Sequence, residues 1–251
     1  MIKAIVTGHS RGLGEALAAA LLQREIAVLG LSRQGNAALA AQHGTALCEV
    51  ALDLGQDGGA ALATWLDSGA LARWLAEDTE TAMLVNNAGT LAPMGLLGMH
   101  GASEIARGVT LNVSAPLMLS DAFCRATRDL SDRRILHVSS GAARTPYPGW
   151  SVYCATKAAL DHHARAVAAE AHPGLRIASV APGVLDTAMQ AEIRSSSLER
   201  FPQRARFEDL HRNGELSAPA HAAARMVDHL LGEHFGRATT TDLRDLPTHS
   251  S

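Results

Sequence analysis

The stretch IKAIVTGHSRGLGEALAAALLQREIAVLGL, residues 2–31, contains the pattern that sets the fold. A β-branched apolar run at 2–7 leads into a glycine-rich segment at 8–14, followed by an Ala- and Leu-rich helical pattern at 15–24. A second apolar run occupies residues 26–31. Strand, glycine turn, helix and strand in this order form a βαβ unit. The glycines allow the backbone to approach a pyrophosphate, which then lies at the helix N-terminus. These residues therefore predict a dinucleotide-binding unit.

Apolar runs and helical patterns continue to alternate along the chain. Further strands are expected at 45–50, 81–87, 134–139, 175–180 and 238–243, and further helices at 59–76, 103–128, 154–171 and 217–231. Strands and helices that alternate in this way form a parallel sheet with helices on both faces. We therefore expect one α/β domain over residues 1–251, built on a doubly wound parallel sheet.

The alternation stops after Pro182-Gly183, where a polar stretch rich in Arg and Glu begins and extends over residues 184–214. Doubly wound sheets bind their ligands beyond the carboxyl ends of the strands. Loops of this length in compact domains commonly act as lids or binding segments. We interpret residues 184–216 as a helical substrate lid within the domain. A pair of solvated helices without a binding role is the alternative.

Composition and charge argue against several classes of function. The chain has 251 residues and a net charge of −3, without the basic block that nucleic-acid binding requires. No apolar run approaches the roughly 20 residues of a membrane span. Three scattered cysteines suit reduced thiols better than a disulfide framework, and the histidines lack metal-ligand spacing. We expect a cytoplasmic protein with no metal, nucleic-acid or membrane partner.

A second informative stretch is SSGAARTPYPGWSVYCATK, residues 139–157. Tyr153 and Lys157 are four residues apart at the start of a helical pattern, so their side chains share one face. A cation beside a phenol favours the phenolate, and we expect Lys157 to lower the pKa of Tyr153 from about 10. Such a phenol can exchange a proton with a substrate oxygen near neutral pH. Ser140 can offer a hydroxyl to the same oxygen, with Ser139 as the rival.

Six motifs occur in order along nearly the whole chain. They are Thr-Gly-x-x-x-Gly-x-Gly at 7–14, Asn-Asn-Ala-Gly at 86–89, the mid-helix Asn112, the trio Ser140, Tyr153 and Lys157, then Pro182-Gly183, and finally Thr187. In this set the chain resembles the classical short-chain dehydrogenase/reductase family. The resemblance implies a Rossmann-like sheet of seven strands, a nicotinamide cofactor and a catalytic tetrad of Asn112, Ser140, Tyr153 and Lys157. The family spacing of thirteen residues before the Tyr favours Ser140 over Ser139.

The resemblance also implies roles for the tetrad. Tyr153 would protonate a carbonyl oxygen as hydride arrives, while Lys157 would lower the pKa of Tyr153 and hold the nicotinamide ribose. Ser140 would polarise the substrate oxygen where negative charge develops. Asn112 is a poor helix former because its amide competes for backbone groups. It would mark a local kink that holds a proton-relaying water, the alternative being an exposed polar side chain.

A narrower likeness lies in PYPGWSVYCATKAALD at 146–161 and APGVLDTAMQAEIRSSS at 181–197. Both stretches resemble the branch of sepiapterin reductases and bacterial benzil reductases. Those enzymes use NADPH to reduce one carbonyl of a vicinal diketone or of a pterin side chain. In sepiapterin reductases an acidic residue near the C-terminus anchors the pterin. The sequence leaves open whether Asp242, Asp245 or neither corresponds to this residue.

The end of the second strand indicates which cofactor is used. NAD sites usually place an acidic residue there, whereas an Arg accommodates the 2′-phosphate of NADP. The strand ends Leu31-Ser32-Arg33 without an acid, and Arg11 in the glycine turn can reach the same phosphate. We therefore expect NADPH. The expected cofactor-binding residues are Gly8, Ser10, Arg11, Gly12, Leu13, Gly14, Arg33, Asp53, Asn87, Ala88, Gly89, Tyr153, Lys157, Pro182, Gly183, Val184 and Thr187.

The expected function is NADPH-dependent reduction of a small-molecule ketone to an alcohol. Substrate contacts are expected from Ala142, Tyr147, Trp150, Leu185 and Met189, which suit a bulky or aromatic carbonyl compound. The alternatives are an NAD-dependent alcohol dehydrogenase and a non-catalytic regulator that senses NADP. The resemblance further implies a homodimer or homotetramer.

Overall fold

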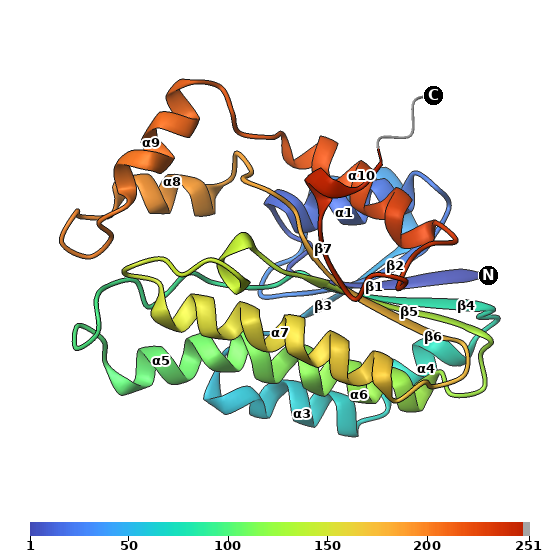
Figure 1. Cartoon of the computed structure of the whole chain (residues 1–251). Coiled ribbons are helices and arrows are strands. Elements are labelled where there is room, and N and C mark those ends of the chain that lie inside the picture. The colour runs from blue at the N-terminus through green and yellow to red at the C-terminus, as the bar shows by residue number, and fades with distance from the viewer. Residues whose placement is uncertain (248–251) are drawn as a thin grey trace.

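A parallel sheet of seven strands, in the order β3-β2-β1-β4-β5-β6-β7, runs through the computed structural model, which describes residues 1–247 (Figure 1). The strands are β1 (Ile2–Thr7), β2 (Ala27–Ser32), β3 (Leu47–Ala51), β4 (Thr81–Asn86), β5 (Asp132–Val138), β6 (Leu175–Ala181) and β7 (Thr240–Asp242). The strand order reverses direction between β1 and β4, which is the switch point where such sheets bind ligands. The predicted Rossmann-like, doubly wound sheet is confirmed.

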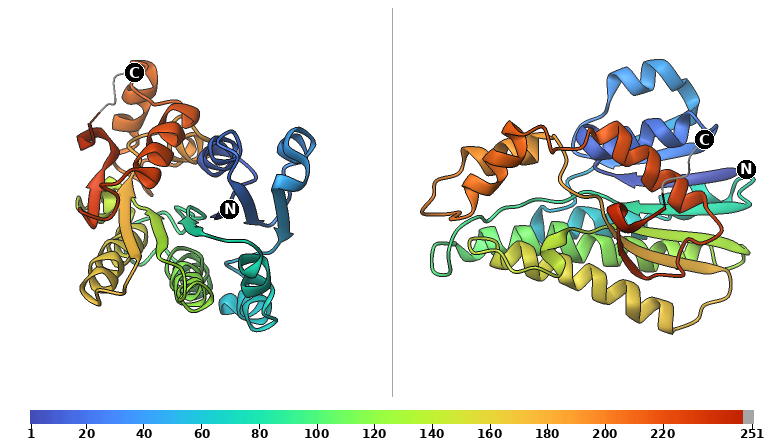
Figure 2. Two further views of the ribbon diagram at one scale, coloured as in Figure 1. Left: turned by 90° about the vertical axis from the view of Figure 1, so that its right-hand side faces the viewer. Right: turned by 45° about the horizontal axis from the view of Figure 1, so that its top comes forward.

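Helices cover both faces of the sheet (Figure 2). One face carries α1 (Gly12–Leu22), α2 (Ala37–His43) and α10 (Pro219–Leu231), and the other carries α3 (Ala60–Asp67), α4 (Ala70–Ala76), α5 (Ala102–Val109), α6 (Ala115–Ala126) and α7 (Ser151–Ala169). Neighbouring residues of β1 point into the two separate cores, Val6 beneath α1 and Ile5 toward Phe123 of α6. No helix within residues 1–247 is long and apolar enough to cross a membrane.

Two helical patterns differ from the prediction. The expected helix at 59–76 is divided into α3 and α4, because Gly69 has a left-handed conformation with φ of 74°. The expected helix at 103–128 contains a π-helical segment, Thr110–Ser114, between α5 and α6. Helix α2 was not predicted, and its N-terminus is capped by Asn36, whose side chain accepts a hydrogen bond from Leu39 N.

The segment after β6 folds into α8 (Ala188–Ser195) and α9 (Arg204–Arg212), which lie beyond the carboxyl ends of the strands (Figure 1). It leaves and rejoins the body of the protein at one place. Ser217 N donates to Val184 O at 3.0 Å, and Asp186 N donates to Ser217 O at 3.0 Å. Two buried rings, Phe201 and Phe207, hold the helices against Trp150.

Candidate active site

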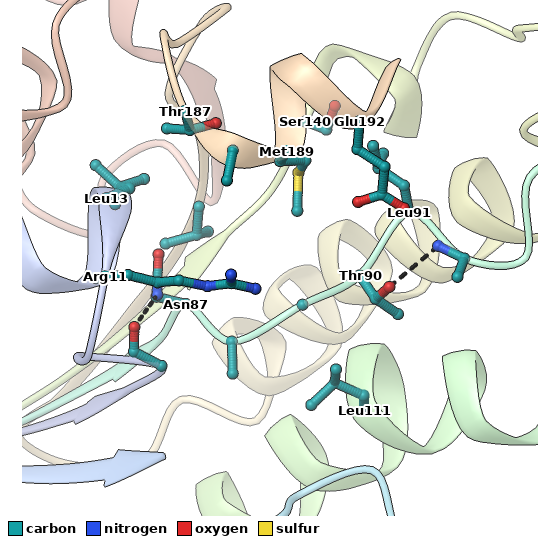
Figure 3. A pocket seen from close by; sticks show the side chains of 18 of the residues that line it. Arg11, Leu13, Asn87, Thr90, Leu91, Leu111, Ser140, Thr187, Met189 and Glu192 are labelled. Atoms are coloured by element: carbon teal, nitrogen blue, oxygen red, sulfur yellow. Dashed lines mark hydrogen bonds between the residues drawn. The ribbon is translucent and has the colours of Figure 1, made fainter. Parts of the chain in front are cut away.

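A cavity of about 910 Å³ opens at the carboxyl ends of the central strands. The glycine turn before α1 forms one end, and residues of α7 and α8 form the other. Figure 3 shows Arg11 extending across the cavity from the turn, with Met189 and Glu192 of α8 on one side and Leu111 on the opposite side. Its size suits a dinucleotide together with a small substrate.

The glycine turn is shaped for close contact with a ligand. Gly8 and Gly12 have φ of 69° and 60°, which L side chains rarely adopt. A Cβ on Gly14 would lie only 2.1 Å from Gly8 O. Helix α1 begins directly after Arg11, and no side chain caps its first amides. An uncapped helix N-terminus attracts anions, so the turn fits the pyrophosphate of a dinucleotide.

The ends of β1 and β4 are tied together beneath the cavity. Thr7 Oγ1 accepts hydrogen bonds from the backbone N–H groups of Asn87 and Ala88, both at 2.9 Å. Asn87 Nδ2 donates to Thr7 O at 2.9 Å in return. A Cβ on Gly89 would lie 3.3 Å from Asn112 Oδ1 and 3.6 Å from Lys157 Nζ, so glycine there keeps this part of the cavity open.

The cavity wall near β2 carries the two arginines expected to select the cofactor. Arg11 and Arg33 both line the cavity, and within residues 1–247 neither takes part in an ion pair. Asp53 also lines it, and its carboxylate is 3.3 Å from Arg107 Nη2. Two unpaired guanidinium groups suit a dianionic phosphate.

A polar network that the sequence did not predict supports the glycine turn. His9 is fully buried, and its Nε2 lies 2.6 Å from Glu49 Oε1, which also accepts a bond from Asn36 N at 2.6 Å. Although burial acts to raise it, these hydrogen bonds and the charge of His9 hold the pKa of Glu49 below its ordinary value. A Cβ on Gly30 would lie 2.5 Å from the His9 ring. A glycine within a strand often marks a close approach of this kind. Gly30 is therefore the sequence signal from which the contact with His9 could have been found.

Tyr153 and Lys157 project from one face of α7 and are both buried. Lys157 Nζ lies 5.8 Å from the centroid of the Tyr153 ring and donates to Val138 O at 2.8 Å. Burial raises the pKa of Tyr153 to about 12, with a hydrogen bond involving Ser140 acting in the opposite direction. Burial also lowers the pKa of Lys157 to about 8, and Asp161 opposes that change.

The expectation that the pKa of Tyr153 lies below its ordinary value is therefore wrong for this structure, in which burial raises it. The physical reason is that both groups are withdrawn from water, which disfavours phenolate and ammonium alike. The ammonium also directs a hydrogen bond to Val138 O rather than to the phenol oxygen. Spacing along a helix predicts which side chains meet, but it does not predict how deeply they are buried.

The two neighbouring serines after β5 have separate partners. Ser139 Oγ donates to Asp161 Oδ1 at 2.6 Å, so its hydroxyl is engaged within the protein. Ser140 Oγ accepts a bond from Ala142 N at 3.1 Å and lines the cavity near Tyr153. Ser140 is thus the serine whose hydroxyl is available at the phenol.

Asn112 lies in the π-helical segment, where the sequence predicted a kink. Its side chain is buried and fully engaged. Oδ1 accepts from Thr90 N at 2.9 Å, and Nδ2 donates to Thr90 O at 2.8 Å and to Thr156 Oγ1 at 3.1 Å. The amide therefore joins the loop after β4 to α7, one position before Lys157.

All residues expected to bind the cofactor line the cavity, whereas the expected substrate residues divide into two groups. Trp150, Leu185 and Met189 line it. Ala142 and Tyr147 are not among the lining residues. The Tyr147 ring packs against Trp150 and Phe207, with centroid distances of 5.2 and 6.2 Å, and so supports the wall from behind.

Several lining residues were not predicted. They come mainly from the loop after β4, from the π-helical segment and from α8. They include Thr90, Leu111, Gln190, Glu192 and Ile193. Neither Asp242 nor Asp245 is among the lining residues. Asp242 instead forms a two-point ion pair with Arg244, whose hydrogen bonds hold the pKa of Asp242 below its ordinary value. Within residues 1–247 no group of three or more His, Cys, Asp or Glu is placed to hold a metal ion.

Comparison with known proteins places these observations in a family. Residues 3–198 match the family model for short chain dehydrogenase. The chain is similar to benzil reductase ((S)-benzoin forming) of Bacillus cereus, with 35% identity over 240 residues covering 92% of this chain and 94% of the relative. It is also similar to sepiapterin reductase of Meriones unguiculatus, with 33% identity over 258 residues covering 96% and 95%.

Solved structures give the same result. A short-chain dehydrogenase/reductase from Burkholderia vietnamiensis shares 46% identity with a TM-score of 0.70, covering 98% of both chains. A structure from Beutenbergia cavernae, which contains bound NADP at low occupancy, shares 25% identity with a TM-score of 0.79, covering 96% of this chain and 94% of that one.

Proposed function

The chain belongs to the short-chain dehydrogenase family, and we propose that within this family of NAD(P)-using oxidoreductases it is an NADPH-dependent carbonyl reductase. The observation that carries the proposal is one cavity with the glycine turn at one end and Ser140, Tyr153 and Lys157 at the other. This arrangement supports the proposal, because Tyr153 would then be the proton donor at the reactive end of a bound dinucleotide.

The cofactor proposal rests on the fit of the residues present. The glycine turn and the start of α1 would hold the pyrophosphate, and Asp53 would meet the adenine. Arg11 and Arg33 would hold the 2′-phosphate, which favours NADPH over NADH. Lys157 and Thr187 would hold the nicotinamide half. Bound NADPH would supply the hydride that reduces the carbonyl carbon.

The protonation state of Tyr153 is compatible with reduction. A phenol with a pKa of about 12 keeps its proton at neutral pH, so Tyr153 can donate that proton to the carbonyl oxygen. Ser140 would donate a hydrogen bond to the same oxygen, and protonated Lys157 would stabilise the phenolate that remains. Oxidation of an alcohol needs Tyr153 as a base, which this burial disfavours.

The substrate proposal is a bulky ketone, such as a vicinal diketone or the side-chain carbonyl of a pterin. Similarity to a benzil reductase and a sepiapterin reductase supports it, and so does the wall formed by Leu91, Trp150 and Met189. We treat residues 1–251 as one domain in which residues 184–216 act as the lid. The proposal includes a cytoplasmic location and self-association as a homodimer or homotetramer.

Oxidation of NADPH and NADH with a small panel of ketones tests the proposal. The panel is benzil, a second vicinal diketone, sepiapterin and a simple aromatic ketone. We expect turnover with NADPH on a diketone, and a loss of about 10³-fold in kcat for Tyr153→Phe, because general acid catalysis contributes on this scale. NADPH affinity, measured by quenching of tryptophan fluorescence, should change less than about twofold since the phenyl ring keeps the packing.

Three results would contradict the proposal. Tyr153→Phe with wild-type turnover would exclude Tyr153 as the proton donor. Tight NADPH binding without turnover on any ketone would favour the non-catalytic regulator, and preference for NADH would favour the NAD-dependent alcohol dehydrogenase.

A further inference from the structure

Helix α7 carries a third titratable group in line with Tyr153 and Lys157. Asp161 follows Lys157 by four residues, as Lys157 follows Tyr153, so all three share one face of the helix. All three side chains are buried. Asp161 Oδ1 accepts hydrogen bonds from Ser139 Oγ at 2.6 Å and from Ser179 Oγ at 2.7 Å.

The second carboxylate oxygen is less well supported. Asp161 Oδ2 is buried, and within residues 1–247 no hydrogen-bond donor reaches it. Arg144 Nε lies 3.9 Å away on a side chain that is 44% exposed. A buried carboxylate is costly unless positive charge lies near it. The buried cation on the same helix face is Lys157, whose pKa Asp161 raises against the effect of burial.

Asp161 and Lys157 also form hydrogen bonds to the same short segment at the end of β5. Lys157 Nζ bonds to Val138 O, Asp161 Oδ1 bonds to Ser139 Oγ, and the next residue is Ser140. Ser139 and Ser140 both line the cavity, but the Ser139 hydroxyl donates to Asp161, whereas the Ser140 hydroxyl is the one hydrogen-bonded to Tyr153. The orientation of residues 138–140 therefore depends on both charged side chains.

We propose that Asp161 is a positioning residue that keeps Lys157 protonated and orients the segment containing Ser140. The proposal rests on the proposed reductase function, since it assigns a role within that active site. Asp161 itself touches neither cofactor nor substrate, and it does not line the cavity.

The other titratable groups around this pair do not substitute for Asp161. On α7, Tyr153 keeps its proton because burial raises its pKa to about 12. On β5, His137 is influenced by the charge of Lys157, but burial lowers its pKa to about 3, so it is neutral. The loop before α7 contributes Arg144, which is a cation. Asp161 is thus the anion that acts on Lys157 among the described residues.

The test is the pH dependence of NADPH affinity and of kcat/KM for Asp161→Asn. Asparagine keeps the shape and one acceptor but removes the charge, so Lys157 should lose its proton at lower pH. Relative to wild type, both quantities should fall about 3- to 10-fold further at pH 8.5 than at pH 6.5. The matched control is Ser179→Ala, which removes one hydrogen bond and leaves the charge, so its alkaline limb should coincide with that of wild type.

A uniform loss for Asp161→Asn at all pH values would overturn the proposal, because a merely structural role has no alkaline signature. If Asp161→Asn does not fold, the proposal is tested with Arg144→Gln, whose side chain is half-exposed. Removing that cation leaves the Asp161 charge to act on Lys157 alone, so the alkaline limb should move to higher pH. An unmoved limb contradicts the proposal. Failure of the reductase function itself is distinguishable, because wild type would then show no turnover at any pH.

Discussion

The two ends of the cavity are built by different forces. At the glycine turn, polar side chains and backbone groups form two sets of hydrogen bonds, one between Thr7 and Asn87 and one between His9 and Glu49. At the opposite end, aromatic rings from separate segments pack against one another, and Trp150 stacks on Phe201 with centroids 4.5 Å apart. The first end is fixed in shape by bonding geometry. The shape of the second end is set by the packing of its rings, and we expect that it can be altered without disturbing the first end.

Gly14→Ala should break the first end most severely. The new Cβ would meet Gly8 O at 2.1 Å, and a backbone atom cannot move aside as a side chain can. We expect NADPH affinity to fall about 100-fold or more, equivalent to about 3 kcal/mol of overpacking. Gly141→Ala at the other end is the control, since nothing lies within 4 Å of its Cβ position. Fluorescence titration with NADPH would measure both, and equal affinities would refute the rigid turn.

Arg33→Ala should remove selectivity while leaving the turn intact. Arg33 has no ion-pair partner within residues 1–247, so its loss leaves no buried charge unpaired. We expect kcat/KM with NADPH to fall about 10- to 100-fold, the scale of a charge-assisted hydrogen bond. The value with NADH is the internal control and should stay within about twofold. An equal fall with both cofactors would mean that Arg33 supports the fold rather than the 2′-phosphate.

Phe201→Ala should act at the second end alone. The ring is fully buried against Trp150, so its removal leaves a cavity that costs about 3 kcal/mol locally. We expect KM for a bulky ketone to rise about tenfold, with NADPH affinity unchanged. Leu198→Ala, 54% exposed in the same segment, is the matched control and should match wild type. A large loss of NADPH affinity in Phe201→Ala would show that the two ends are coupled.

Glu49→Gln should change the pH dependence of stability through the glycine-turn end of the cavity. The pKa of Glu49 is held below its ordinary value of 4.5, so its stabilising contribution is present above that value and is lost as pH falls through the folded pKa. We expect wild type to exceed the variant by about 1 kcal/mol in unfolding free energy at pH 7. The difference should shrink toward zero in acid. Urea unfolding at several pH values measures it, and a constant difference would contradict the ion-pair account.

The sequence pattern specifies the glycine turn and the tetrad more tightly than the substrate wall, and the reason is physical. The glycine turn, Asn87 and the tetrad follow fixed spacings, because backbone geometry allows few alternatives. The substrate wall depends on which rings meet across the fold, and Tyr147 was placed in the cavity although it packs behind it. Spacing alone carries no information on such contacts.

The sequence pattern also did not predict how deeply the active-site side chains are buried or how their charges balance. The pKa of Tyr153 rises rather than falls because α7 is covered on the side that carries it. Asp161 had a detectable signal, since it continues the four-residue spacing of Tyr153 and Lys157. That spacing shows a shared face, and only the fold shows that the face is buried.

The π-helical segment Thr110–Ser114 makes the protein sensitive to chain length at one point. A π turn holds one residue more than the α-helix around it, and each residue rotates an α-helix by about 100°. Deleting a single residue there would restore regular winding and keep the helix continuous. It would also rotate Asn112 out of register with Thr90 and Thr156. A change in length at this position, with no change in residue chemistry, would therefore be enough to separate the loop after β4 from α7.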